Sequence, residues 1–239
     1  MNIPENLKIM GVSPYIFWAI VGCVFALAVF LYYIKRNGMT VRLPLFLMFS
    51  SFLGVFPGAR IFSYIASKIY YANTGKESYG GLVFYGGLLG FLTVFYLLQK
   101  ISVNSQSKVL WDGAALAIPL FHTFGRIGCA FSGCCFGIEF DKFYIAYSDG
   151  IKRFPVQFSE AFSEFLLFSV LMIFACKGKH RGSLTKIYLF TYSVLRFFLE
   201  FLRGDEIRGM IGFFSFSQVC SIAVLAGLII HSLKRRSDT

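Results

Sequence analysis

Four polar residues along one apolar stretch are the clearest sign of chemistry in this sequence. Tyr192, Arg196, Glu200 and Arg203 are separated by four, four and three positions. On an α-helix, this spacing places all four side chains on one face. A guanidinium group carries a planar fork of N–H donors that fits a phosphate or a carboxylate. The stripe predicts an anion-binding site, although a structural ion pair between Arg196 and Glu200 would also explain it.

Other polar residues stand at a similar depth in other apolar segments. Arg126 and Arg60 each lie far along an expected helix, about 26 Å from its start at 1.5 Å per residue. Gln157 and Glu160 lie in the first turn of another helix, and Tyr85 opens a third. A charge inside hydrocarbon costs about 2.5–3.5 kcal/mol or more, so these groups need partners or a function. Because the arginines outnumber the acids, we expect a pocket that prefers the phosphate of an anionic lipid.

The elements that must position these residues are membrane helices. The chain has 239 residues, of which 56% are hydrophobic and 15% charged, whereas a soluble domain carries about 25% charged residues. The apolar blocks are about 20 residues long, enough to cross a bilayer as helix. We therefore predict an all-α integral membrane protein that forms a single transmembrane domain over residues 1–239. About seven transmembrane helices are expected, at 14–34, 43–71, 81–99, 109–125, 156–176, 184–202 and 214–233, with Pro57 kinking or interrupting the second.

Basic residues predict the orientation of these helices. The formal net charge of +11 would suggest a nucleic-acid partner for a soluble protein. Here the lysines and arginines gather in alternate short loops and in the C-terminal tail, which seven crossings place on the cytoplasmic side. The N-terminus is then expected outside and the C-terminus in the cytoplasm, with no nucleic-acid partner. The polar residues described above then lie toward the outer face of the membrane.

The densest motif, GRIGCAFSGCCFG, occupies residues 125–137. Four glycines and an arginine at the end of a helix predict a tight loop around a small charged group. On the oxidising side of a membrane, Cys129 could form a disulfide with Cys134 or Cys135, which is the interpretation we favour. A covalent relay on Cys129 is an open alternative. No metal site is expected, because no histidine or further cysteine neighbours the loop.

This motif resembles that of the prolipoprotein diacylglyceryl transferases, which reads roughly GRxGNFxNGExxG. Four further segments are similar to family elements and occur in the same order. Residues 58–60 (GAR) resemble a GxR element, and residues 84–90 (FYGGLLG) resemble FHGGLxG. Residues 155–161 (PVQFSEA) resemble HPxQLYEA, and residues 192–203 resemble YxxxRFxxExxR. The five elements together span most of the chain.

The resemblance implies a seven-helix enzyme of the bacterial inner membrane with its active site toward the periplasm. Such an enzyme transfers diacylglyceryl from phosphatidylglycerol to the lipobox cysteine of a prolipoprotein and releases glycerol 1-phosphate, without a metal or cofactor. Arg126 and Arg196 would hold the lipid phosphate and stabilise charge on the leaving group. The residues implied in substrate binding are Arg60, Gly86, Gly87, Gly125, Gly128, Cys129, Gly137, Gln157, Glu160, Tyr192, Glu200 and Arg203.

The sequence departs from the family pattern at the positions closest to the thiol chemistry. Tyr85 replaces the family histidine, Cys129 and Ser132 replace two asparagines, and Cys134 replaces a glutamate. A thiol with a pKa of about 8.5 needs a base, and tyrosine is a poor one. His122, one turn before Arg126, is a candidate replacement base, or else a histidine packed between helices.

Two further alternatives follow from these departures. The acceptor could differ from a prolipoprotein, or the protein could be a non-catalytic relative that binds an anionic lipid. A small-anion transporter is disfavoured, because most of the key polar residues collect at one leaflet instead of at the midplane.

Overall fold

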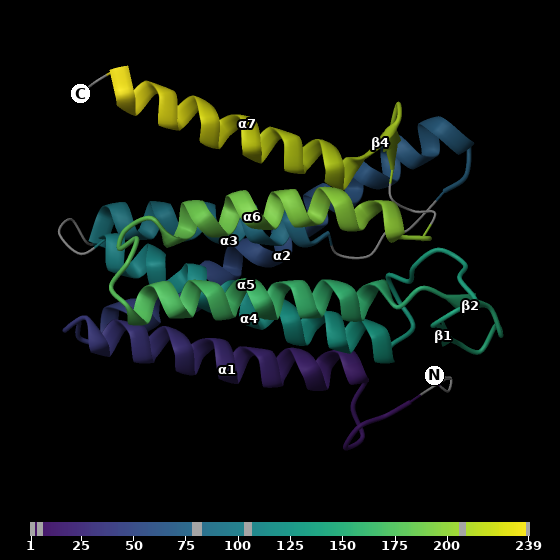
Figure 1. Cartoon of the computed structure of the whole chain (residues 1–239), viewed down its shortest axis with the longest axis horizontal. Helices are drawn as coiled ribbons and strands as arrows, with labels where there is room; N and C mark the ends of the chain where they lie inside the picture. The colour runs from purple at the N-terminus through teal and green to yellow at the C-terminus, as the bar shows by residue number, and fades with distance from the viewer. Residues whose placement is uncertain (1–2, 4–6, 78–82, 103–106, 206–208, 238–239) are drawn as a thin grey trace. The chain divides into compact units, whose positions relative to one another are not determined.

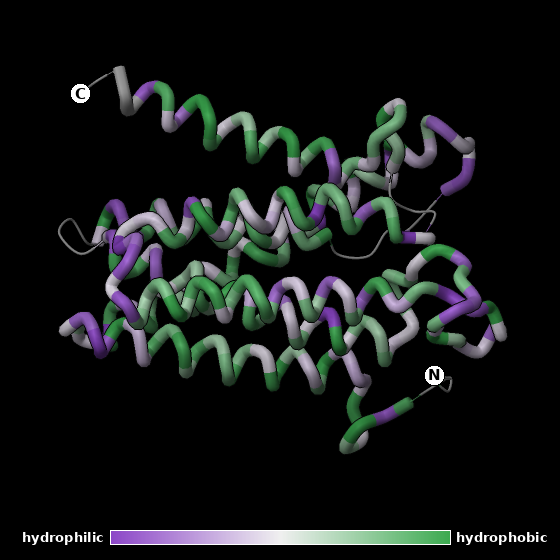
Figure 2. Tube along the Cα trace, in the orientation of Figure 1, coloured by the Kyte–Doolittle hydropathy of each residue, from purple (hydrophilic) through white to green (hydrophobic). Residues whose placement is uncertain are grey.

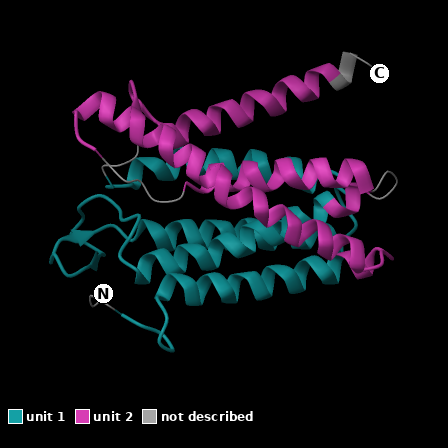
Figure 3. Ribbon diagram, turned by 180° about the vertical axis from the view of Figure 1, so that it is seen from behind, with its two compact units in different colours: residues 1–33, 111–205 teal, residues 34–110, 206–239 magenta. Residues whose placement is uncertain are grey.

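The computed structural model describes residues 3, 7–77, 83–102, 107–205 and 209–237. The chain divides into two compact units, each assembled from two separate stretches of sequence (Figure 3). Unit 1 contains residues 1–33 and 111–205, and unit 2 contains residues 34–110 and 206–239. The prediction of a single transmembrane domain remains a prediction.

Unit 1 contains four helices that run along one another (Figure 1). A two-stranded antiparallel hairpin, in which Ile145 pairs with Arg153, precedes the third of them. The elements are α1 (Pro14–Arg36), α4 (Ser107–Phe131), β1 (Ile145–Ala146), β2 (Lys152–Arg153), α5 (Val156–Cys176), α6 (Leu184–Leu199) and the 3₁₀ turn η1 (Glu200–Leu202). The last three residues of α1 and the first four of α4 belong to unit 2.

Unit 2 contains three helices and a second short hairpin, in which Met210 pairs with Ser215. The elements are α2 (Arg42–Thr74), α3 (Phe84–Ser102), β3 (Met210–Ile211), β4 (Phe214–Ser215) and α7 (Phe216–Ser237).

The described helices confirm the predicted all-α fold, with two differences in detail. α4 continues to Phe131, six residues beyond its expected end, so Arg126 and Cys129 are helical. α2 runs without interruption through Pro57, so the expected break is absent, whereas the expected kink stays a prediction. Residues 81–82, where the third helix was expected to begin, lie outside the described residues.

The helices have the character of membrane spans. Six helices in the described chain are long and apolar enough to cross a bilayer, whereas α6 has only 16 residues. Hydrophobic residues occupy most of each long helix in Figure 2, and many large apolar side chains are exposed, such as Leu53 at 76% and Phe162 at 68%. Apolar surface on this scale is expected of a protein whose solvent is lipid. The number of crossings and the orientation of the termini remain predictions.

The most buried of the six spans is α4, which carries Arg126. Of its most apolar 18 residues, 67% are buried, whereas the corresponding buried share in the other spans is between 17% and 39%. α4 also holds the start of α6, because the buried Asp112 carboxylate accepts hydrogen bonds from the backbone N–H groups of Gly182, at 2.5 Å, and Leu184, at 3.0 Å. A carboxylate that receives the first N–H groups of a helix satisfies donors that the helix itself cannot.

In unit 2, α2 and α3 meet backbone to backbone through glycines. A Cβ atom on Gly86 would collide with the carbonyl oxygen of Gly58, and one on Gly90 would collide with that of Gly54. Close approach through small residues is the usual way in which membrane helices pack. Gly86 therefore has a packing role in the fold. The role of Gly86 and Gly87 in substrate binding stays a prediction.

We expect Gly86→Ala to destabilise the protein by about 1–3 kcal/mol, because the methyl group forces two backbones apart. Gly227→Ala in α7 is the matched control, since no atom lies within 4 Å of its added Cβ. The alanine there should be neutral or slightly stabilising. Thermal unfolding in detergent measures both, and equal midpoints for the two variants would contradict the packing role of Gly86.

Candidate functional site

A buried ionic cluster in unit 1 joins α4, α5 and α6. The Glu160 carboxylate of α5 lies between two arginines: its Oε2 is 2.7 Å from Arg126 Nε, and its Oε1 accepts a hydrogen bond from Arg196 Nη1. All three residues are buried, with exposures of 3% for Glu160 and 6% for each arginine. The structure thus brings Arg126 and Arg196 into one shared environment, as the sequence predicted.

The polar stripe of α6 and η1 extends this cluster. Arg196 Nη2 lies 2.6 Å from Glu200 Oε2, one helical turn further along. Arg203 makes a two-pronged contact with Asp205, at 2.9 Å from Nε and 2.5 Å from Nη2. Its remaining terminal nitrogen, Nη1, lies 4.0 Å from Glu160. Glu160 is therefore the acid around which three arginines gather.

The charge balance corrects one expectation from the sequence. Among the described residues, the three arginines of the cluster meet four carboxylates: Glu160, Glu164, Glu200 and Asp205. An excess of arginines therefore cannot explain why a site at this cluster would prefer an anion. Such a preference must come from arginine N–H groups that donate to no carboxylate. Both terminal nitrogens of Arg126 donate no hydrogen bond to any described residue, and the one contact of Arg203 Nη1 is the long one to Glu160.

His122 braces Arg126 from one turn earlier in α4. Arg126 Nε donates a hydrogen bond of 3.0 Å to His122 Nε2, and His122 Nδ1 lies 3.3 Å from Glu164 Oε1. Because Nε2 accepts, the ring is neutral and its proton is on Nδ1, facing the carboxylate. The ring also meets Tyr192 edge to face, with centroids 5.7 Å apart. This geometry indicates that His122 positions Arg126 and does not act as the base.

A substitution separates these two roles of His122. We expect His122→Phe to lower the diacylglyceryl transfer implied by the sequence motifs about 10- to 100-fold, because Arg126 loses the hydrogen-bond acceptor that positions it. His122→Gln should retain most of the activity, since an amide oxygen can still accept from Arg126 Nε but cannot serve as a base. Transfer rates of both variants measure this, and a glutamine variant as inactive as the phenylalanine variant would restore His122 as the base.

The loop after α4 is held against the cluster by its backbone. The Gly137 backbone pairs with that of Arg203 in an isolated bridge, and a Cβ at Gly137 would collide with the Phe154 carbonyl oxygen. The Gln157 side chain donates to the Cys134 carbonyl at 2.9 Å and to the Tyr147 hydroxyl at 2.8 Å. Burial raises the pKa of Tyr147 to about 12, so it stays a neutral acceptor. Gln157 and Gly137 therefore shape the loop, and Gly137 ties it to the backbone of Arg203.

Three cysteines converge in this loop and the end of α4. Cys129, Cys134 and Cys135 are free thiols whose Sγ atoms all lie within 4.8 Å of one another, so the favoured disulfide is absent from this described segment. Hydrogen bonds from Cys129 and Cys134, together with the charges of Arg203 and Arg126, lower the pKa of Cys135 well below its ordinary value. The thiols therefore belong to the same electrostatic environment as the arginines.

Comparison with known proteins decides the family. A family model described as prolipoprotein diacylglyceryl transferase matches residues 4–233. The chain belongs to the prolipoprotein diacylglyceryl transferase family. Phosphatidylglycerol–prolipoprotein diacylglyceryl transferase 2 of Clostridium perfringens is 35% identical over 179 residues, which cover 70% of this chain and 66% of that protein. The similarly named protein of Clostridioides difficile is 33% identical over 178 residues, covering 72% and 71%.

The family elements divide between the two units. Arg126, Arg196 and the other cluster residues belong to unit 1, whereas Arg60, Tyr85, Gly86 and Gly87 belong to unit 2. Tyr85, at the position of the family histidine, is 2% exposed, and its hydroxyl lies 2.6 Å from Ser221 Oγ of α7. Arg60 is exposed on α2, with its guanidinium 5.3 Å from the Phe56 ring centre.

The two glycines of the motif that lie in α4 have different surroundings. Gly128 packs on α1, since a Cβ there would be 3.1 Å from Tyr15 Cα. Gly125 has no neighbouring atom within 4 Å of an added Cβ, so the structure gives no packing reason for a glycine there.

Glu164 is the cluster residue that our reading of the family motif misses. It lies one turn after Glu160, is 4% exposed, and belongs to an otherwise apolar stretch of α5. The spacing of four between the two glutamates was the available signal, because it places both on one helix face.

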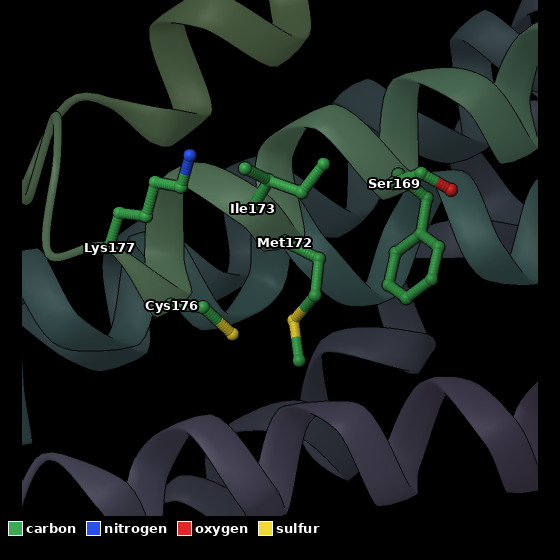
Figure 4. Close-up of a pocket in the computed structure, with 6 residues that line it drawn as sticks. Ser169, Met172, Ile173, Cys176 and Lys177 are labelled. Atoms are coloured by element: carbon green, nitrogen blue, oxygen red, sulfur yellow. The ribbon is translucent and has the colours of Figure 1, made fainter.

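A shallow apolar depression on α5 lies away from the family motifs. Phe168, Ser169, Met172, Ile173, Cys176 and Lys177 line it, all near the C-terminal end of one helix (Figure 4). Glu160 lies at the opposite end of α5. The depression has no cluster of acids or arginines, so we assign it no part in the family chemistry.

Proposed function

We propose that the protein transfers the diacylglyceryl group of phosphatidylglycerol to the cysteine thiol of a prolipoprotein lipobox. The reaction would occur at the outer side of a bacterial inner membrane and release glycerol 1-phosphate. Family membership and the substrates named for the relatives support this proposal. The basic loops support the orientation, since they are expected in the cytoplasm.

The single observation that carries the proposal is the set of N–H donors left over in the ionic cluster. Arg126 keeps two terminal nitrogens for a ligand, and Arg203 contributes Nη1, which lies 4.0 Å from the same Glu160 carboxylate. Two guanidinium groups with unused donors fit a phosphodiester, which offers two unesterified oxygens. Glu160, Glu200 and Asp205 hold the arginines in place before the lipid arrives, so little reorganisation is needed in the reaction.

The reaction follows from this placement. The acceptor thiol must lose its proton to solvent, and its sulfur then attacks the glyceryl carbon attached to the phosphate oxygen. The C–O bond breaks with its electrons going to that oxygen, so negative charge grows on the departing phosphate. Arg126 and Arg203 would stabilise this charge most strongly in the transition state, which is the condition for faster chemistry.

The test is to incubate the purified full-length protein with labelled phosphatidylglycerol and a lipobox peptide. Formation of the thioether product together with glycerol 1-phosphate would support the proposal. A peptide with serine in place of the cysteine is the matched control and should give no product. Lipid that binds without turnover would favour a non-catalytic protein, and consumption of lipid only in crude membranes would point to a different acceptor; either result contradicts the proposal.

A further inference from the structure

The three converging thiols have the arrangement of a metal site with an open position. Cys129 comes from the last turn of α4, and Cys134 and Cys135 come from the loop that follows. Gly133 and Cys135 both have left-handed backbone conformations, with φ of 67° and 57°, which turn the chain back on itself. The Cys134 N–H then donates to the Cys129 carbonyl at 3.2 Å. The fold, and not a disulfide, brings the three Sγ atoms within 4.8 Å of one another.

We propose that Cys129, Cys134 and Cys135 bind a thiophilic divalent cation such as Zn²⁺, whose fourth position takes the thiol of the acceptor cysteine. This inference rests on the proposed function. No metal was expected from the sequence, because the motif lacks a fourth cysteine or histidine. Three protein ligands with a position left for a substrate are, however, the usual pattern of a catalytic zinc site.

The spacing of the thiols suits such an ion. Zinc–sulfur bonds of about 2.3 Å in a tetrahedron place sulfur atoms about 3.8 Å apart. The present separations, all within 4.8 Å, exceed that value by no more than about 1 Å. Soft thiolate ligands select zinc or copper over magnesium or calcium, which prefer oxygen.

The surrounding charge also suits the ion. Three thiolates and one divalent cation carry a net charge of −1. Arg126 lies three residues before Cys129 on α4, and the Arg203 backbone pairs with Gly137, two residues after Cys135. An anionic metal–thiolate group beside two guanidinium groups is electrostatically favourable. Cys134 is exposed and Cys135 is partly exposed, so an acceptor can reach the open position.

A metal bound by the three cysteines would activate the acceptor thiol, a step for which the altered family residues provide no clear base. A thiol bound to such a metal loses its proton outright, and the proton passes to solvent. The bound sulfur then attacks the glyceryl carbon as described above, the C–O bond breaks, and the phosphate departs toward Arg126 and Arg203. The new thioether is a weak ligand and leaves, while the three cysteines keep the metal for the next thiol. No oxidant or reductant is consumed.

Metal binding is tested on the full-length protein, purified with reductant and stripped with a chelator. Titration with Cd²⁺, followed by the ultraviolet thiolate-to-cadmium band and by elemental analysis, should give one tightly bound ion per chain. Cys129→Ser and Cys134→Ser should each weaken binding by more than about 100-fold, beyond the usual cost of losing an outer-shell partner. Cys23→Ser and Cys176→Ser are the matched controls and should bind as the unaltered protein does. An unaltered chain that binds no ion, or that shows a disulfide between Cys129 and either neighbour by mass spectrometry, would overturn the proposal.

A second readout does not need turnover. Adding a lipobox peptide to the cadmium-loaded protein should intensify the thiolate band, whereas the serine peptide should leave it unchanged. If the cysteine peptide has no effect, the open position does not take the acceptor and the inference fails. Chelation should lower transfer at least tenfold and Zn²⁺ should restore it. Full transfer by the stripped protein would overturn the inference while leaving the proposed function standing.

Discussion

Arg126→Gln is expected to lower the rate of diacylglyceryl transfer by about 10²- to 10³-fold, the usual cost of removing one donor that stabilises developing charge. The terminal nitrogens of Arg126 are the main unused donors of the cluster, and glutamine cannot replace a charged fork. Arg126→Lys keeps the charge but loses the two-pronged geometry, so we expect it to recover only a small part of the activity. Initial rates with labelled lipid measure the effect.

The matched control is Arg181→Gln, at the other end of unit 1. Arg181 is exposed near the start of α6, where it interacts with Tyr33 and Asp112. The control should transfer at close to the rate of the unaltered protein. Arg126→Gln with unchanged transfer, in a protein whose unfolding midpoint is also unchanged, would remove the arginine from the reaction and with it the proposed phosphate site.

Glu160→Leu is expected to destabilise the protein by about 3–5 kcal/mol, the cost of breaking a buried ion pair from one side. Glu160 contacts Arg126 and Arg196 directly, and the substitution leaves two buried cations without their shared acid. Unfolding by heat or denaturant in detergent measures the loss. Glu139→Gln is the control, because Glu139 is exposed in the same unit and should shift stability little.

A double substitution isolates the pair itself. Glu160→Leu combined with Arg196→Leu removes both partners, and replacing a whole buried pair by apolar residues costs much less than breaking it. The double variant still leaves Arg126 without Glu160 and Glu200 without Arg196, so we expect it to lose less stability than the sum of the two single losses. If the two losses simply add, the arginine does not depend on Glu160, and the cluster is not the unit that its geometry implies.

The sequence predicted the helices and the centre of the site because both rest on strong local patterns. Apolar blocks of membrane length leave little alternative to helix, since backbone groups in lipid must be bonded internally. Tyr192, Arg196, Glu200 and Arg203 share one face because helical periodicity requires it. Charged residues in such segments are rare enough that their meeting could be inferred, and Arg126 and Arg196 do meet at Glu160.

The remaining features depend on three-dimensional partners that no local pattern specifies. α4 continues past Gly125 because its last turns pack on α1, where Gly128 lies against Tyr15. The convergence of three thiols depends on backbone turns at Gly133 and Cys135 that spacing alone does not reveal. Each arginine of the cluster faces a carboxylate, so the expected excess of arginines over acids is absent. Counting charges in the sequence could not show this, because it does not reveal which N–H donors are already used.

Asp112 has a consequence for how α4 and α6 can vary. It fixes the beginning of α6 at Gly182 and Leu184, while the ion pairs around Glu160 fix Arg196 three turns later. An α-helix advances 1.5 Å and turns 100° with each residue, so one inserted residue between these anchors would swing the guanidinium group away from its acid. The number of residues from Leu184 to Arg196 is therefore fixed by the two anchors. Insertions or deletions in this stretch should be tolerated far less than substitutions of its lipid-facing side chains.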